Sequence, residues 1–238
     1  MMTGPTVFTA RLPDGAAAVM DIRTGRGRWC HLNPTAAALW LALAAGTPAH
    51  QAVDDLTTRC AARGADPANV RTDLAHLVAR FQALGWLSTL AAPVSQPPAP
   101  TVRPCPGDVR LTPTDRIIAF LALTAALAML RLVPIRVTIA ALRALRNVVP
   151  AAPASADVAD KQLVAVRHVA RHWPIRLACL EESAACFLAA RLRRRGVTFV
   201  LGARTAPAAA HAWIETEDQV IGQHSSNRAW PYVPALRI

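Results

Sequence analysis

The sequence predicts an α+β protein of two domains, and three features of the 238-residue chain lead to that prediction. Hydrophobic residues make up 53% of the chain and charged residues 17%, which excludes disorder and provides material for a buried core. A proline-rich segment divides the chain. Before it, three short strands precede three helices, and after it, helices precede antiparallel strands. Such segregated runs are the α+β pattern.

The first domain, residues 1–90, is expected to be winged-helix-like. Turn signals separate strands predicted over 6–11, 16–23 and 26–31. Each of the three following helices starts with a capping side chain before a proline at the first helical position. These pairs are Asn33-Pro34, Thr47-Pro48 and Asp66-Pro67, and the helices end at Gly46, Gly64 and Gly85.

The third helix, residues 66–84, argues against a nucleic-acid partner. Arg71 and Arg80 balance Asp66 and Asp73, so this helix has no net charge. Contacts with phosphates supply most of a protein's non-specific affinity for DNA, so a recognition helix without net positive charge is expected to bind DNA poorly. The net charge of +11 resides mostly in the second half, where it favours an acidic partner or substrate. The first domain is therefore expected to bind a peptide.

A semi-rigid linker is predicted over residues 91–111, because prolines crowd its first part. Beyond it, the longest apolar run, residues 117–130, is shorter than the roughly 20 residues that span a membrane. It is expected to be a core helix, with a peripheral membrane anchor as the alternative. The five cysteines and the lack of a secretory segment predict reduced thiols and a cytoplasmic location.

In the second domain, residues 112–238, a cysteine stands where a helix begins. A helical stripe runs from Cys179 toward Gly196, and the preceding Trp173-Pro174 interrupts the earlier helical pattern. The unpaired N–H groups at a helix start stabilise a thiolate, so the pKa of Cys179 is expected to fall toward neutrality. Strands predicted over 197–203 and 210–215 follow, and the second carries His211. Papain-like and transglutaminase-like enzymes use this arrangement.

Two stretches of the first domain, residues 32–40 (LNPTAAALW) and 84–87 (LGWL), carry a family resemblance that covers about residues 6–90. On these residues the first domain resembles the RiPP recognition element, a small domain that binds precursors of ribosomally synthesised and post-translationally modified peptides. This resemblance implies that a leader peptide adds as a strand beside the third strand. Carried over, the binding residues are Arg28, Trp29, Cys30 and His31 at the edge, and Val70, Leu74 and Leu77 on the third helix. Arg23, Arg26 and Arg28 would attract acidic leader residues, and core packing is the competing interpretation of the helix residues.

The second domain resembles the lasso-peptide leader peptidases, which are transglutaminase-like cysteine proteases. Cys179-Leu180 and the strand His211-Ala212-Trp213-Ile214-Glu215 carry this resemblance over about residues 112–223. It implies that Cys179 attacks the bond between leader and core while His211 handles the proton, and that water then hydrolyses the thioester. It also implies a partner, a separate ATP-dependent, asparagine-synthetase-like lasso cyclase. No cofactor, metal ion or integral membrane segment is expected.

The third member of the site departs from the family pattern. Family members carry an aspartate twelve residues after the histidine, where this chain has Gln223. A glutamine oxygen can orient imidazole but brings no negative charge. A three-residue turn would pair Trp213 with Gln223 and place Gln223 on the His211 face, whereas a two-residue turn would place His224 there. The order of preference is Gln223, then Glu215, then Asp218.

Two other functions stay open at this stage. The same thioester could pass to an amine, giving acyl transfer instead of hydrolysis. Alternatively, the protein is a non-catalytic scaffold that delivers the precursor to the cyclase, which the glutamine at position 223 favours. Cys186 is expected to fill the core, and His168 and His172 lack a third metal ligand at a suitable spacing.

Overall fold

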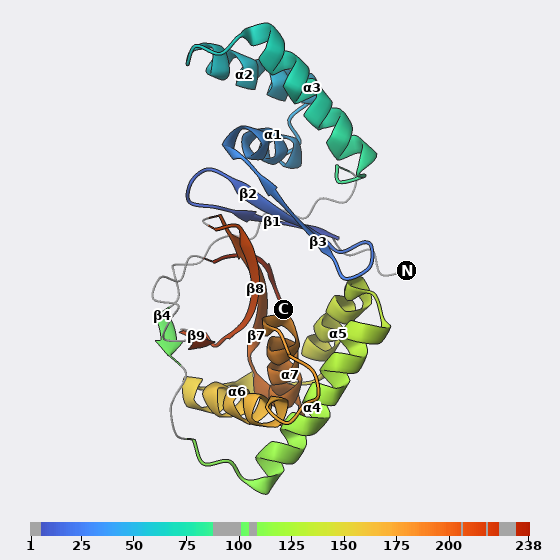
Figure 1. The fold of residues 1–238 in the computed structure, drawn as a ribbon, viewed down its shortest axis with the longest axis vertical. Coiled ribbons are helices and arrows are strands. Elements are labelled where there is room, and N and C mark those ends of the chain that lie inside the picture. Colours follow the sequence, from blue (N-terminus) through green and yellow to red (C-terminus); the bar gives the residue numbers. More distant parts are fainter. Residues whose placement is uncertain (1–5, 88–100, 105–108, 206, 218, 224–231) are drawn as a thin grey trace.

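The computed structural model describes residues 6–87, 101–104, 109–205, 207–217, 219–223 and 232–238 (Figure 1). The elements of the N-terminal part are β1 (Val7–Arg11), β2 (Ala17–Asp21), β3 (Arg28–Leu32), α1 (Pro34–Ala44), α2 (Ala49–Ala61) and α3 (Pro67–Ala83). These are the three strands and three helices that the sequence predicts, in the predicted order.

Helix capping is confirmed at two of the three predicted starts. Asn33 accepts a hydrogen bond from the Ala36 N–H at 2.9 Å, and Asp66 caps α3. The predicted cap at Thr47 is wrong, because α2 begins one residue later and Pro48, which cannot cap, takes the N-cap position. All three predicted helix-ending glycines have the left-handed conformation.

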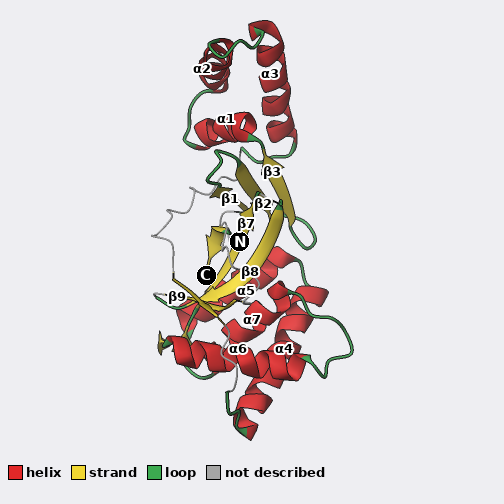
Figure 2. Cartoon of the chain, turned by 60° about the vertical axis from the view of Figure 1, so that its left-hand side comes forward, coloured by secondary structure: helices red, strands yellow, loops and turns green. Residues whose placement is uncertain are grey.

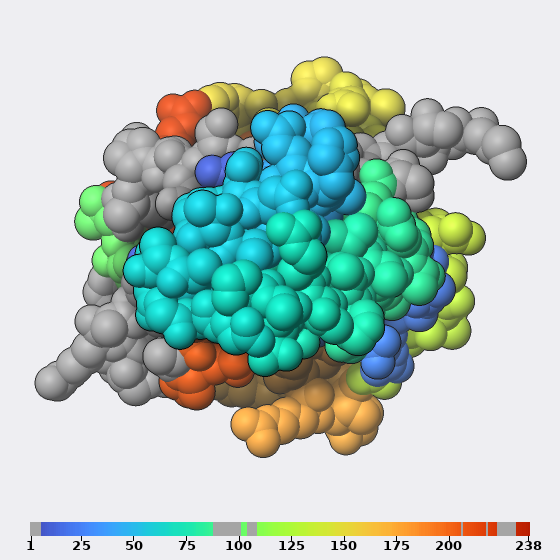
Figure 3. Space-filling view, turned by 90° about the horizontal axis from the view of Figure 1, so that it is seen from above, coloured from blue at the N-terminus to red at the C-terminus, as the bar shows by residue number. Residues whose placement is uncertain are grey.

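The N-terminal sheet is antiparallel, in the order β1-β2-β3, so β3 is an edge strand. One face of this sheet and the three helices enclose an aromatic cluster. Trp40, Phe81 and Trp86 lie with ring centroids 5.3 to 5.7 Å apart. Figure 3, seen from above, shows α2 and α3 packed together at this end of the molecule.

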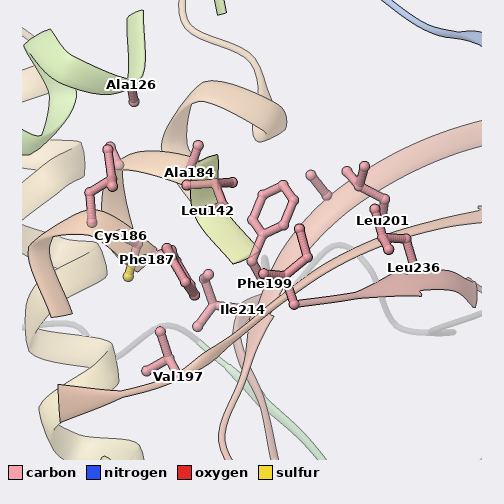
Figure 4. Packing of buried hydrophobic residues seen from close by; sticks show 14 of the residues in the cluster. Ala126, Leu142, Ala184, Cys186, Phe187, Val197, Phe199, Leu201, Ile214 and Leu236 are labelled. Atoms are coloured by element: carbon pink, nitrogen blue, oxygen red, sulfur yellow. The ribbon is translucent and has the colours of Figure 1, made fainter. Parts of the chain in front are cut away.

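The C-terminal part is built around a five-stranded sheet. Its elements are β4 (Thr101–Pro104), α4 (Pro113–Leu132), α5 (Ile135–Val148), β5 (Ala152–Pro153), α6 (Ala156–Ala170), α7 (Cys179–Leu192), β6 (Arg195–Gly196), β7 (Thr198–Arg204), β8 (Ala209–Glu215), β9 (Gln219–Gln223) and β10 (Val233–Arg237). The sheet order is β10-β7-β8-β9-β4, and only β4 pairs in parallel. Helix α7 is the central helix: Phe187 packs on Phe199 and Ile214 of the sheet, with α4 on its other side (Figure 4).

The two parts share one hydrophobic core. The second face of the N-terminal sheet, including Phe8, Ala18 and Met20, belongs to the same buried cluster as α4, α7 and β10. Figure 2 shows the N-terminal sheet lying between its own helices and the C-terminal part. The interface is tied by the Ile135 N–H donating to the Gly25 carbonyl at 3.0 Å and by Arg143 stacking 5.3 Å from the Phe8 ring centroid. The two parts are therefore held in a fixed relation.

Two segments differ from the sequence prediction. Within the predicted linker, Thr101–Pro104 forms β4, because an edge strand tolerates proline where an inner strand does not. The apolar run in α4 is a core helix on one side only: Leu123 is fully buried, but Ile117 and Leu121 are more than half exposed. Within the part of the chain that the structure describes, no helix has both the length and the hydropathy needed to cross a membrane.

Candidate functional site

Cys179 is the first residue of α7, as the sequence predicts. The chain enters the helix extended at Ala178, whose N–H donates to the Glu181 carboxylate at 3.1 Å. This bond fixes the first turn. The Cys179 side chain is half-buried at the edge of the main core. The thiol lies beside the first N–H groups of the helix, which have no partner within the helix itself, and it is not fully enclosed.

His211 lies on β8, at the edge of an aromatic group. Its ring is nearly parallel to that of Trp213 at 6.1 Å and lies 5.0 Å from the Tyr232 ring. Directly across the ladder stands Gly202 on β7, where a Cβ would lie 2.5 Å from the Trp213 ring. The glycine therefore lets Trp213 lie against the sheet, and the aromatic rings limit the orientations open to His211.

Cys179 and His211 line the same cavity, of about 110 Å³. The remaining walls come from α6, α7, β8 and β9, and include Leu163, Arg167, Glu182, Ser183, Ile221 and Gly222. Gly222 has φ +71°, and a Cβ there would lie 1.9 Å from the Leu163 side chain. Only glycine fits this wall, both for backbone conformation and for space. Both residues line this cavity, but the side chains of β8 alternate: the His211 ring lies with Trp213 and Tyr232 on one face of the sheet, whereas Ala212 and Ile214 pack on the other face, toward α7 and Cys179.

The expected lowering of the Cys179 pKa is wrong in direction. Burial raises the pKa of the thiol above its ordinary value, and the nearby Glu181 carboxylate acts in the same sense. The N–H groups of Ala212, Leu180 and Cys179 itself oppose these effects without overcoming them. The resting group is therefore a neutral thiol, with N–H donors already directed at its sulfur.

The register between β8 and β9 corrects the predicted pairing of Gln223. Ile214 pairs with Ile221 and Glu215 with Val220, and the Thr216 N–H donates to the Gln219 carbonyl at 2.9 Å. The turn therefore has two residues. This is the alternative in which His224, and not Gln223, is expected on the His211 face, and His224 lies outside the described residues. Gly222 in the left-handed conformation and a register shift against β4 interrupt regular alternation just before Gln223. The period-of-two argument for Gln223 therefore fails, and its role stays a prediction.

Glu215, the second choice for the third member of the site, forms hydrogen bonds with residues other than His211. This buried carboxylate accepts hydrogen bonds from the Trp213 indole N–H at 2.8 Å and from Arg237 at 3.0 Å. It supports His211 only indirectly, by holding Trp213 in place. The third choice, Asp218, lies outside the described residues.

An ion pair in the cavity wall was not predicted from the sequence. Arg167 of α6 donates to Glu182 of α7 at 3.1 Å, and both side chains are partly exposed in the cavity. The two residues are separated by 15 positions in the chain, so no local pattern indicated their contact. They add a polar part to a cavity wall that also includes the apolar Leu163.

At the predicted leader-binding edge, the side chains of β3 divide between two faces. Cys30 is half-buried against the N-terminal hydrophobic cluster, to which Val70 and Leu77 of α3 also belong. Trp29 instead packs against the shared core, Arg28 is exposed, and His31 Nε2 lies 3.1 Å from the Arg204 carbonyl oxygen of β7. The edge strand therefore directly contacts the part that carries Cys179.

Two residues of the predicted leader site have structural roles. Leu74 is 1% exposed and packs in the core, as the competing interpretation held. Arg23 pairs with Asp21 at 2.5 Å and donates to the carbonyls of Leu84 and Gly85, which attaches the end of α3 to the sheet. Neither is available to a peptide in this conformation.

The paired histidines of α6 do not form a metal site with other described residues. The rings of His168 and His172 lie 5.6 Å apart, and His172 Nδ1 lies 3.1 Å from the His168 carbonyl oxygen. Among the described residues, no group of three or more potential ligands comes together.

Comparison with known families finds two matches along the chain. Residues 17–87 match the family described as coenzyme PQQ synthesis protein D, and residues 120–234 match the transglutaminase-like superfamily. No curated protein and no solved structure matches the chain significantly. The first match covers β2, β3 and the three N-terminal helices, and the second covers most of α4 and all of α7 and β8.

Proposed function

Because the chain joins a RiPP recognition element of the PqqD type to a transglutaminase-like domain, we propose that it binds the leader of a lasso-peptide precursor and cleaves it from the core peptide. One observation carries the proposal: Cys179 at the start of α7 and His211 on β8 line one cavity. Cysteine catalysis requires the thiol and the imidazole in one site, so the proposal needs the His211 ring to reach Cys179 across this cavity.

The neutral thiol suggests that His211 acts as a general base when substrate binds. The Cys179 sulfur forms a bond to the scissile carbonyl carbon while its proton passes to His211. The Ala212 N–H and the first N–H groups of α7 stabilise the negative charge that develops. His211 then gives the proton to the departing core amine, which leaves the leader as a thioester on Cys179. Water hydrolyses the thioester and restores the thiol.

The leader is proposed to add as a fourth strand along β3, with its main chain supplying affinity. Arg28, Trp29, Cys30 and His31 form that edge, and the half-buried Val70 and Leu77 of α3 are proposed to supply apolar contacts. The bond between His31 and the β7 carbonyl supports this assignment, because it holds the edge against the domain that carries Cys179.

The released core amine needs an enzyme that consumes it. We place an ATP-dependent, asparagine-synthetase-like lasso cyclase in that role, as the resemblance implies. We also place the reaction in the cytoplasm, where the free cysteines of the described residues, Cys30, Cys60, Cys179 and Cys186, would stay reduced.

The proposal is tested by mass spectrometry of a lasso-peptide precursor incubated with the full chain. We expect two fragments whose masses sum to the precursor plus one water. Cys179→Ala should give no fragments and yet bind a fluorescent leader peptide with unchanged affinity. Fragments that persist with Cys179→Ala would contradict the thiol mechanism. A joined product would assign acyl transfer instead, and leader binding without any thiol-dependent product would assign a delivery scaffold.

A further inference from the structure

Helix α4 exposes a row of apolar side chains along most of its length. Ile117, Phe120 and Leu121 are 60%, 49% and 55% exposed, and Ala125, Ala128 and Leu132 continue the row. These positions recur every three or four residues, so they share one side of the helix. The row is about 22 Å long at 1.5 Å per residue. An exposed apolar stripe of this length indicates a surface that another molecule covers.

A groove lies beside this row, where α4, α5 and α7 meet. It holds a cavity of about 320 Å³, with apolar walls formed by Leu121, Ala125, Leu145, Val149, Leu188 and Leu192. Leu192, in the last turn of α7, is 60% exposed and extends the apolar surface. The cavity is large enough to receive one or two apolar side chains from a partner.

Arginines without acidic partners surround the groove. Arg191 lines the cavity, is 8% exposed, and has an Nε atom with no hydrogen-bond partner, while its guanidinium lies 5.1 Å from the Phe187 ring centroid. Arg194 also lines the cavity, and Arg146 lies near Arg191. Among the residues that the structure describes, none of these three arginines forms an ion pair, whereas Arg193, between two of them, pairs with Asp115 at 2.5 Å.

Arg194 also occupies an unfavourable backbone conformation. Its φ of +55° lies in the left-handed region, and it is the only described non-glycine residue to do so. Glycine is the usual residue at this position after a helix. A strained position that keeps a long cationic side chain at the mouth of the groove favours a binding role for that charge.

We propose that the groove between α4, α5 and α7 is a docking site for an acidic amphipathic helix of a partner protein. Apolar side chains of that helix would lie along the α4 row and enter the cavity, while its carboxylates would meet Arg146, Arg191 and Arg194. The proposal does not depend on the peptidase chemistry, because this groove is at the opposite end of α7 from Cys179.

A second copy of this chain and a membrane surface fit the groove less well. A symmetric contact through this face would bring the same arginines of two copies together, and each chain carries a net charge of +11. A flat bilayer surface does not enter a cavity between helices, and it leaves a buried cation such as Arg191 without a specific carboxylate. A shaped, acidic partner satisfies both the cavity and the charges.

The test uses the full chain and two fluorescein-labelled helical peptides of about 18 residues, or five turns. Both peptides carry leucine at every third or fourth position; one has glutamates beside the leucines and the other has lysines. We expect fluorescence anisotropy at low ionic strength to show at least about tenfold tighter binding of the glutamate peptide. Leu121→Asp and Arg194→Glu should each weaken that binding by about tenfold or more. Arg63→Glu, an equal charge change just after α2, should leave it unchanged.

Leu121→Asp alters an exposed side chain, so it should melt within a few degrees of the wild type and cleave precursor at the same rate. Failure of the docking proposal would thus be separate from failure of the peptidase proposal. Equal binding of both peptides, or equal weakening by Arg63→Glu, would overturn the docking site. Leu121-dependent sedimentation with phosphatidylglycerol vesicles, without preference between the peptides, would assign the surface to a membrane instead.

Discussion

The two ends of helix α7 have opposite chemistry. Its N-terminal end presents Cys179 to a small, partly polar cavity that His211 also lines. Its C-terminal end presents Arg191 and Arg194 to a larger apolar cavity beside α4. Unpaired N–H groups at one end favour a sulfur anion, and unpaired carbonyl groups at the other favour cations. One helix can therefore support catalysis at one end and binding at the other.

The comparison also shows the limit of the helix-dipole argument. At the N-terminal end, burial and the Glu181 carboxylate raise the Cys179 pKa in spite of the N–H groups. At the other end, burial is the main cause that lowers the Arg191 pKa, and Arg146 adds to it. At both ends burial disfavours the charged form of the side chain, the thiolate of Cys179 and the guanidinium of Arg191. A substrate or partner whose polar groups stabilise that charged form would therefore bind there with additional affinity.

The largest expected effect is a difference in thiol reactivity between Cys179 and Cys186, which lie seven residues apart on α7. Cys186 is fully buried, and burial raises its pKa to about 12, so this thiol stays protonated at pH 7. In the folded protein, iodoacetamide should alkylate Cys179 at least about 100-fold faster than Cys186. The Cys179 rate should still rise with pH near 9, because its pKa is raised above that value. Peptide mapping by mass spectrometry measures both rates, and equal rates would contradict the assignment.

Loss of Asp115 should have the largest effect on stability. This buried carboxylate accepts from Thr112 and pairs with Lys161 at 3.0 Å and Arg193 at 2.5 Å, which joins α4, α6 and the end of α7. We expect Asp115→Asn to reduce the free energy of unfolding by about 3 kcal/mol. The control is Asp54→Asn, which breaks the exposed pair with Arg71 and should change stability by less than about 0.5 kcal/mol. Denaturant titration measures the free energy of unfolding of both variants. Equal decreases would show that the buried Asp115 network contributes no more to stability than the exposed Asp54–Arg71 pair.

The same carboxylate predicts a pH dependence. Burial raises the pKa of Asp115, but the Thr112 and Lys161 hydrogen bonds and the Arg193 charge lower it to about 2. A lowered folded-state pKa stabilises the fold above the unfolded value of 3.8, and this stability is lost as the pH falls toward 2. Asp115→Asn should therefore flatten the stability profile between pH 4 and 2. An unchanged slope in that window would contradict the assigned pKa.

The smallest effect is expected at Arg194. Arg194→Gly removes the strain of a left-handed residue but increases the freedom of the unfolded chain, so the net gain should be about 0.5 kcal/mol. The variant should nevertheless lose affinity for the acidic helical peptide. A thermal melt and an anisotropy titration separate the two results. Strong destabilisation would indicate that the Arg194 side chain supports the fold instead of a partner.

The parts of the fold that depend on local signals could be predicted from the sequence. Asn33 and Asp66 cap helices within three residues of themselves, and Cys179 begins α7 because the pattern breaks at Trp173-Pro174. The strand that carries His211 was predicted over residues 210–215 and is observed over Ala209–Glu215. Such signals involve neighbours along the chain, so one sequence is sufficient to detect them.

The parts that depend on distant contacts could not be predicted. Strand β10 pairs with β7 across 30 to 37 positions, and β4 joins the sheet only through β9. The predicted pairing of Trp213 with Gln223 failed because the β8–β9 turn has two residues and not three, and the residue types alone do not decide between the two lengths. The Cys179 pKa and the exposed side of α4 depend on what packs nearby, and that information arises only with the tertiary structure.

The central claim is that Cys179 and His211 act as a unit in one cavity, and precursor cleavage by variants tests it most directly. We measure kcat/KM for a lasso-peptide precursor with Cys179→Ala, His211→Ala and the double variant. If the two residues act together, each single change removes nearly all activity, and the double change removes no more. If either single variant keeps more than about a tenth of the wild-type kcat/KM, the account of the active site is wrong.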